Sequence, residues 1–392
     1  MEIIPGIINP LLKNIIFTHG FILPLRPFEW RNIHWTLINI IVNLWSFIHV
    51  YRLATNEVNN LSRKNNEQPL FVYYIKVHHF VVIPMIFLGF IWHYFHNGHS
   101  IMKLLDHSLF TRTMYRCWPQ SFYYTISIEL FMNGIYMMSR HYYIRSFLFH
   151  GDWQAFQEFF IFYIFYCYLL ITWLLIFYQQ IAINLALKNY RQEFLQVQHE
   201  HHHHDHRHYD WQQYPDQIER KKRLFNRIKN LAQLNGQIQT LMSPIMFIAF
   251  TSESLHVVDT MNQILIRGFR NYWHKCLERI IRTLFYIGIC WLNNENLQQF
   301  KWIQNILVCR KQDLIQRQTY TYYTMNRVKR KININNDRST VAIYSKFNWL
   351  KIYHEKLKLP VNYLFTINAT LCLNWFFFLI SYVSLIYQTR ND

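Results

Sequence analysis

The feature that most constrains this chain is a run of apolar residues at roughly 156–186. No charged residue occurs between Glu158 and Lys188, and aromatic and aliphatic side chains fill most of the interval. A helix needs about 20 mainly apolar residues to cross the hydrocarbon core of a bilayer. The run therefore predicts a transmembrane helix and an integral membrane protein.

Six further segments have a similar character, although two of them are shorter or more polar. The overall mean hydropathy is only -0.05 because strongly polar blocks separate the apolar ones. We predict an all-α integral membrane protein with seven transmembrane helices. The predicted spans are roughly 34–54, 70–95, 118–139, 156–186, 237–263, 278–292 and 363–388.

The distribution of basic residues predicts the orientation of these helices. Of the 40 Lys and Arg residues, 28 lie in the N-terminal segment and in alternate loops on the same side as it, and nine lie on the other side. Cytoplasmic loops carry the excess of Lys and Arg, so the N-terminus is expected in the cytoplasm and the C-terminus outside. The net charge of +18 is thereby explained by topology, and no nucleic-acid partner is expected. The glycosylation sequence that begins at Asn60 falls on the predicted outer side.

A short motif stands near the end of the last predicted helix. Ser381-Tyr382 is followed by five residues that include Ser384 and end at Tyr387, and then by Gln388. Upstream, Phe365, Asn368 and Leu371 form a second pattern, preceded by Phe347 and His354. The whole set resembles the C-terminal signature of insect gustatory receptors, a family of the seven-transmembrane insect chemoreceptor superfamily. The family has Thr-Tyr and Gln-Phe where this chain has Ser-Tyr and Gln-Thr, and its last cytoplasmic loop is shorter.

The resemblance implies a ligand-gated cation channel that detects a small-molecule tastant. Family members look like homo- or heterotetramers in which the last helix of each subunit lines one central pore. The topology is opposite to that of a G-protein-coupled receptor, so no G protein is expected. The expected location is the plasma membrane of gustatory neurons, in their dendrites, with membrane lipid as the other partner.

With this resemblance, five regions can be assigned along the chain. A cytoplasmic N-terminus is followed by a ligand-binding bundle of six helices, which contains a His-rich cytoplasmic loop. A cytoplasmic anchor or loop then leads to the pore-lining helix and a short outer tail. These regions are 1–33, 34–292, 187–236 within the bundle, 293–362 and 363–392.

The last helix has a polar face that suits a pore. Ser381, Ser384 and Gln388 follow one another at i, i+3 and i+7, which is one side of a helix. Four Gln388 amides in a ring would offer neutral oxygens to a passing cation. The alternative is that these side chains bond the backbone or neighbouring helices, as such residues often do in membranes.

Ionisable and polar residues at membrane depth are the candidates for the ligand pocket. Such groups are costly in a bilayer and tend to face water or one another, so they could line a cavity or form ion pairs between helices. Residues at the edges of the spans could instead lie among the lipid headgroups. The pocket candidates are Glu129, Asn133, Thr251, Ser252 and Glu253.

The run His199–His208 contains seven histidines, but it is better explained as a low-complexity loop than as a metal site. No nucleotide-binding loop, nucleophile constellation or zinc-protease motif occurs, so no enzyme, catalytic residue, cofactor or metal is predicted. Three alternatives remain. An odorant-receptor-type subunit would share the architecture. A transporter would show inverted repeats and broken helices. An accessory membrane subunit would need neither inverted repeats nor broken helices.

Overall fold

The computed structural model describes residues 9–26, 33–64, 82–117, 121–204, 214–267 and 269–325. It also describes short stretches and single residues between 356 and 388. Helices dominate, and the two strands are only two residues long each. The elements are α1 (Pro10–His19), α2 (Ile33–Lys64), α4 (Ile83–Leu105), α5 (Ser108–Cys117), α6 (Ser121–Ser139), α7 (His141–His150), α8 (Trp153–His204), α9 (Tyr214–Arg267), α10 (Phe269–Met325), β1 (Pro360–Val361) and β2 (Phe365–Thr366).

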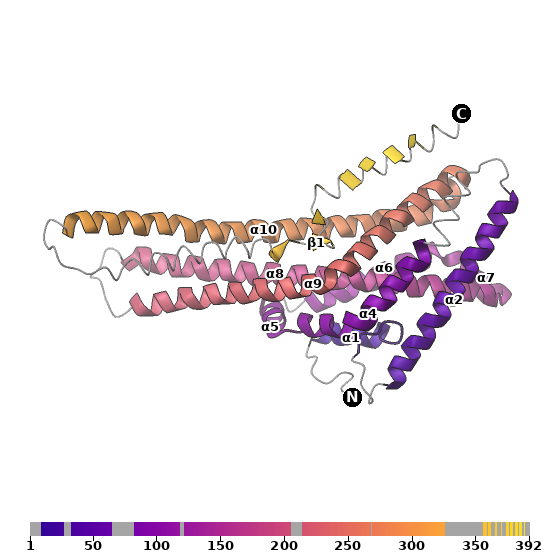
Figure 1. Cartoon of the computed structure of the whole chain (residues 1–392), viewed down its shortest axis with the longest axis horizontal. Helices are drawn as coiled ribbons and strands as arrows, with labels where there is room; N and C mark the ends of the chain where they lie inside the picture. Colours follow the sequence, from indigo (N-terminus) through magenta and orange to yellow (C-terminus); the bar gives the residue numbers. More distant parts are fainter. Residues whose placement is uncertain are drawn as a thin grey trace.

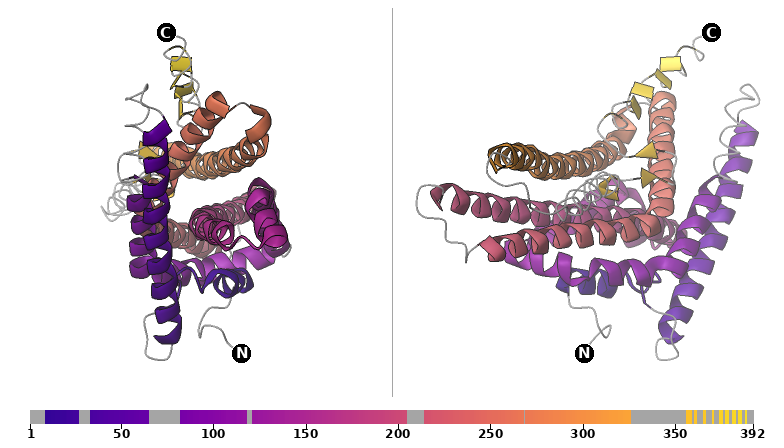
Figure 2. Two further views of the ribbon diagram at one scale, coloured as in Figure 1. Left: turned by 90° about the vertical axis from the view of Figure 1, so that its right-hand side faces the viewer. Right: turned by 60° about the vertical axis from the view of Figure 1, so that its left-hand side comes forward.

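Three helices of more than 50 residues set the shape of the molecule. Figure 1 shows α8, α9 and α10 running side by side along the long axis, and each of them packs against the other two. At one end α2, α4, α6 and α7 gather around them, whereas the other end consists of the long helices alone. The right-hand view in Figure 2 shows the same division into a wide end and a narrow end.

Helix α8 forms the centre of the wide end. The most apolar part of α8 has 78% of its residues buried inside the protein, compared with 22% for the apolar part of α2. A helix that is apolar all round is expected in the core of a large protein or within a membrane. Helix α8 is therefore covered by its neighbours, and α2 turns apolar side chains outward.

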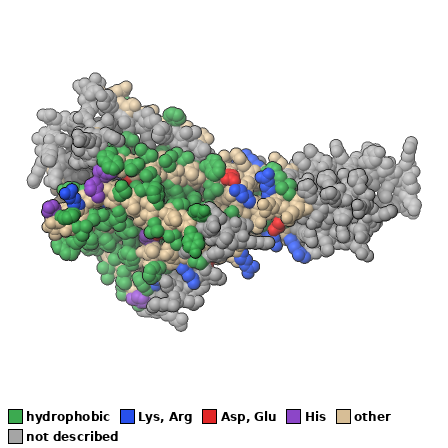
Figure 3. Space-filling model, turned by 180° about the vertical axis from the view of Figure 1, so that it is seen from behind, with side chains coloured by type: hydrophobic (Ala, Val, Ile, Leu, Met, Phe, Trp, Pro, Cys, Tyr) green, Lys and Arg blue, Asp and Glu red, His purple; other side chains and the backbone are tan. Residues whose placement is uncertain are grey.

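The outer surface of the wide end is apolar. Trp92, Tyr142 and Phe149 are each more than 70% exposed, and apolar side chains cover most of this end in Figure 3. Lys and Arg side chains gather toward the narrow end in the same view. Large exposed apolar areas mark membrane or protein contacts. Since an apolar surface surrounds the wide end, this end suits a bilayer.

Within the described part of the chain, three helical segments are long and apolar enough to cross a membrane: Ile33–Arg52, Trp153–Gln196 and Arg223–Val258. They overlap the first, fourth and fifth predicted spans. The third predicted span matches α6, and the sixth lies inside α10. The second overlaps α4, but its residues up to 81 lie outside the described residues. The fold is helical and has helices that are long and apolar enough to cross a membrane. Seven spans with the stated orientation remain a prediction.

Most of the described residues in the predicted connecting regions 187–236 and 293–362 are helical. Helix α8 continues to His204, α9 begins at Tyr214, and α10 continues to Met325. The helices therefore extend beyond the predicted spans, and the cytoplasmic location of these regions remains a prediction. Buried amide side chains such as Gln180, Asn184 and Asn296 bond across α8 and α10 and take the place of apolar packing. Helix α8 includes the first part of the His-rich run, as far as His204. The rest of the run lies outside the described residues.

The N-terminal segment packs into the bundle. Leu12, Ile16 and Leu23 are completely or almost completely buried in the main core. The carbonyl oxygens of Gly20 and Ile22 accept hydrogen bonds from the amides of Asn39 and Asn43 in α2, at 3.0 and 2.7 Å. The sequence assigned residues 1–33 to a cytoplasmic terminus and gave no sign of this packing.

A short turn connects α7 to α8. Gly151 has φ 63°, a left-handed conformation that favours glycine, and its N–H donates to the carbonyl of Phe147. The Asp152 carboxylate accepts a hydrogen bond from the backbone N–H of Ala155, which lowers the pKa of Asp152. A carboxylate in this position caps the helix that follows. The junction therefore sets where the central helix begins.

The predicted start of the last helix, residue 363, was wrong for two residues. Phe365 and Thr366 form β2, which pairs antiparallel with β1 in the register Pro360↔Thr366 and Val361↔Phe365. The described residues from Thr370 to Gln388 are helical. The all-α prediction is confirmed apart from this two-stranded turn.

Candidate functional site

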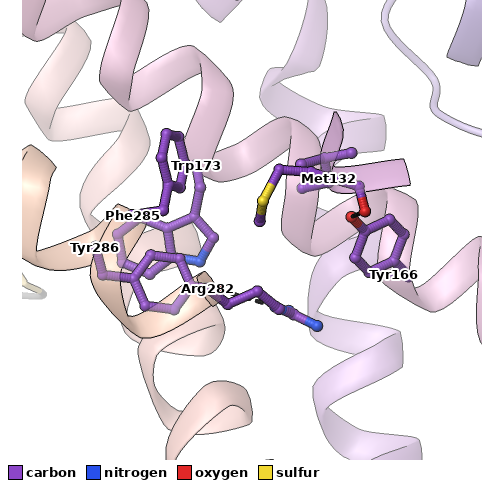
Figure 4. A pocket seen from close by; sticks show the side chains of 7 residues that line it. Met132, Tyr166, Trp173, Arg282, Phe285 and Tyr286 are labelled. Atoms are coloured by element: carbon purple, nitrogen blue, oxygen red, sulfur yellow. Dashed lines mark hydrogen bonds between the residues drawn. The ribbon is translucent and has the colours of Figure 1, made fainter. Parts of the chain in front are cut away.

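An apolar crevice lies where α6, α8 and α10 meet in the wide end. Its walls come from faces at helical spacing on α8 and α10, together with one residue of α6 (Figure 4). The walls stand too close together to admit a water molecule. The lining residues are Met132, Tyr166, Leu170, Trp173, Arg282, Phe285 and Tyr286.

Aromatic rings form most of these walls. The ring centroids of Trp173 and Tyr286 are 4.3 Å apart, and the Tyr166 hydroxyl donates a 2.8 Å hydrogen bond to the carbonyl of Met132. The second contact joins α8 to α6. The crevice is thus built from rigid side chains that link three helices, and it suits a ligand with a flat or apolar body.

A buried charge network closes one side of the crevice. The Arg282 guanidinium donates to the Glu253 carboxylate of α9 and, at 3.1 Å, to the Glu278 carboxylate one turn earlier in α10. It also donates to the Tyr286 hydroxyl at 3.2 Å and lies 5.2 Å from the centroid of the Tyr166 ring. Two carboxylates therefore face the side of Arg282 that does not face the rings.

A second arginine balances the charge of this network. Arg279 Nη1 lies 3.7 Å from a Glu253 oxygen and 3.8 Å from a Glu278 oxygen, which are looser contacts than those of Arg282. With two arginines and two glutamates the network has no net charge. Buried charges are tolerated when they are paired and hydrogen-bonded. The network therefore joins α9 to α10 without making the crevice attractive to a charged ligand.

One crevice side chain has an unused hydrogen-bond donor. Trp173 is 3% exposed, and its indole N–H has no partner among the described residues. Buried donors are nearly always paired. An unpaired donor in a crevice therefore indicates that it bonds a ligand, or a protein group in another conformation. An acceptor atom on a ligand would satisfy it.

None of the five predicted pocket residues lines this crevice. Glu253 bonds the lining residue Arg282, and Ser252 is buried with no partner for its hydroxyl among the described residues. Thr251 is half-buried. Of the two alternatives for the acidic residues, ion pairs between helices describe Glu253 better than a cavity lining does.

Glu129 and Asn133 lie at a different contact, between α1 and α6. A Glu129 carboxylate oxygen is 2.6 Å from His19 Nε2, and both side chains are buried. The Asn133 amide donates to the backbone carbonyl of Glu129 at 3.0 Å. Glu129 thus fixes the end of α1 to the bundle.

The last helix contacts its own bundle through two aromatic residues. Trp375 and Tyr382 pack against Val257 and Val258 of α9. The pore-face candidates Ser381, Ser384 and Gln388 are all exposed. The Ser381 hydroxyl donates to the carbonyl of Phe377. A bond of this kind to the backbone is what the alternative to a pore face predicts.

The other signature residues are only partly described. The backbone of Phe365 belongs to β2, and the backbone of Asn60 belongs to α2. Asn368, Leu371 and Tyr387 lie outside the described residues. These assignments remain predictions.

Sequence reasoning missed the residues that line the crevice. Tyr166, Leu170 and Trp173 stand at i, i+4 and i+7, which is a helix face, but so do many apolar triplets in the same span. Arg282 lies in the predicted span 278–292, and its charge there was the one usable signal. Pairing it with Glu253 required knowing which helices are neighbours.

No protein-family model matches this chain, and no curated protein matches it either. Among solved structures, the chain is similar to the insect olfactory receptor OR5 from Machilis hrabei, with a TM-score of 0.49 and 12% sequence identity. The similarity covers 96% of this chain and 98% of that one. Likeness at this level does not identify a function, so the site is interpreted from its own residues.

Proposed function

We propose that this protein is a subunit of a ligand-gated cation channel of the insect chemoreceptor type, located in the plasma membrane and opened by a small molecule. The observation that carries the proposal is the polar face of the last helix. Ser381, Ser384 and Gln388 lie on one side of it, within the motif that resembles the gustatory receptor signature, and are exposed in the single chain. A pore-lining face must be uncovered by its own subunit, because it meets water and the other subunits.

A central pore would need several copies of this helix. Four subunits, identical or related, would bring four Gln388 amides into one ring. Amide oxygens can replace part of the hydration shell of a cation without holding it as tightly as carboxylates do. The mechanism needs no catalytic residue and no cofactor.

The aromatic crevice is the proposed ligand site. Its apolar walls favour an uncharged ligand, and the charge of Arg282 is already balanced by Glu253 and Glu278. The indole N–H of Trp173 favours a ligand with one hydrogen-bond acceptor. Since the walls stand close together, a ligand must select a wider conformation. That requirement gives ligand binding a way to change the shape of the subunit.

The gustatory assignment rests on Ser381-Tyr382 and Gln388 in their spacing, and it makes the ligand a tastant and the dendrites of gustatory neurons the site of action. An odorant-receptor-type subunit would have the same pore and the same kind of crevice. The two assignments differ in the ligand and in the neuron.

The Trp173→Phe variant tests the ligand site because it keeps an aromatic ring and removes the donor. In cells that express the wild-type chain, acetophenone should evoke cation currents at lower concentrations than α-methylstyrene, which has the same shape without the carbonyl oxygen. A neutral hydrogen bond contributes about 0.5–1.5 kcal/mol. The preference for acetophenone should therefore shrink by up to about tenfold in Trp173→Phe.

Trp291→Phe is the matched control, since Trp291 lies on α10 and is 64% exposed. It should leave the preference unchanged. An unchanged preference in Trp173→Phe would remove the crevice from the proposal. If small aromatic carbonyl compounds evoke no current from protein that reaches the cell surface, the channel proposal itself is wrong.

A further inference from the structure

Two neighbouring residues of α9 contact different parts of the molecule. Glu253 accepts from Arg282, which lines the crevice, whereas the hydroxyl of Ser254 accepts a 2.7 Å hydrogen bond from the indole N–H of Trp375 in the last helix. Successive residues on a helix point about 100° apart, so one helix can touch two neighbours at the same level. A single turn of α9 thus lies between the crevice and the last helix.

The contact with the last helix is small and separate from the main core. Phe250, Val257 and Val258 surround Trp375, and the centroids of the Phe250 and Trp375 rings are 5.8 Å apart. Val257, Val258, Trp375 and Tyr382 form a cluster of their own, apart from the main hydrophobic core. Small half-buried contacts open more easily than core contacts.

A second contact between α9 and the C-terminal part of the chain is deeply buried. The Asn235 amide donates to the carbonyl of Lys356 at 2.6 Å and accepts from the Gln179 amide of α8 at 2.5 Å. Asn235 is fully buried, and Leu357 beside it belongs to the main core. Asn235 and Ser254 are 19 residues apart, or about 28 Å along the helix. The C-terminal part of the chain is therefore held firmly at Asn235, near the middle of α9, and loosely at Ser254, closer to the end of the helix.

We infer that the Ser254–Trp375 hydrogen bond transmits occupancy of the crevice to the last helix. A ligand that widens the crevice moves Arg282, and Arg282 is bound to Glu253, next to Ser254. The hydrogen bond from Trp375 to Ser254 forms when the crevice is narrow. When this bond breaks, the last helix is free to move about the fixed contact at Lys356. Ser254 and Trp375 are positioning residues for the gate. The inference rests on the proposed channel function.

Removing this bond should favour the open channel without ligand. Ser254→Ala removes the acceptor, and Trp375→Phe keeps a ring and removes the donor. Each should raise the spontaneous current per surface-labelled channel by about fivefold and lower the acetophenone concentration for half-maximal current, because the closed state loses a stabilising contact. The double variant should resemble either single variant, since both remove the same bond.

Two controls separate this effect from general damage. Ser254→Thr keeps a hydroxyl and should stay close to the wild type, and Trp291→Phe changes an exposed tryptophan of α10 and should do the same. Wild-type spontaneous current in Ser254→Ala and Trp375→Phe, or additive effects in the double variant, would overturn the inference while leaving the channel proposal intact. A wild-type chain without any ligand-evoked current would overturn both.

Discussion

The Arg282→Ala variant is expected to lose about 3–5 kcal/mol of folding stability, because it leaves two buried carboxylates without their main partner. Glu253 and Glu278 are each almost completely enclosed, and both accept hydrogen bonds from Arg282. Arg279 contacts the same carboxylates only at 3.7 and 3.8 Å. Thermal unfolding of the detergent-solubilised protein, followed by fluorescence-detected size-exclusion chromatography, measures the loss.

Arg279→Ala is the matched comparison, because Arg279 has the same charge in the same network with longer contacts. It should lower the unfolding temperature less than Arg282→Ala does. Combining Arg282→Met and Arg279→Met with Glu253→Gln and Glu278→Gln should recover much of the stability, since no unpaired charge then remains in the network. Equal losses for the two alanine variants would show that Arg282 does not hold the network together.

The His19→Ala variant is expected to release α1 from the bundle. His19 and Glu129 are both buried, and Nε2 lies 2.6 Å from the carboxylate. Removing the histidine leaves a buried carboxylate unsatisfied, which costs about 1–3 kcal/mol or more when the group is charged. The unfolding temperature should fall, and α1 should become accessible to added protease.

A double-mutant cycle with Glu129→Ala isolates the pair from its surroundings. The double variant should be less destabilised than the sum of the two single variants, because it leaves neither partner unsatisfied. Thr18→Ala is a control on the exposed side of α1, where the hydroxyl bonds only the backbone of the same helix. Additive losses in the cycle would mean that His19 and Glu129 act independently.

The apolar spans could be predicted because they follow from composition alone. A run such as 156–186 must be removed from water wherever it lies, and the structure makes it the core of α8. The ends of the helices could not be predicted in the same way. Helices α8 and α10 are joined by polar as well as apolar contacts, and buried amides such as those of Asn184 and Asn296 pair between them. Polar residues of this kind also occur in loops, so their pattern carries little information.

The candidate site was less predictable than the fold. The cost of burying charge drew attention to Glu129 and Glu253. Their partners depend on contacts between residues 29 to 110 positions apart, which a single sequence does not specify. Trp173 carried no signal at all, because a tryptophan in an apolar span is more often a packing residue. Helix α1 was not predicted either, because its apolar face is short and gives little signal.

The most direct test of the account is whether the last helix lines a cation pore. Gln388→Cys should be expressed beside Tyr382→Cys, a position on another side of the helix that packs against Val257 and Val258 of α9. A membrane-impermeant, positively charged methanethiosulfonate reagent should then be applied from outside during ligand-evoked current. We predict that the reagent blocks most of the current of Gln388→Cys and little of that of Tyr382→Cys or the wild type. Current that persists in Gln388→Cys and is blocked in Tyr382→Cys would contradict the account.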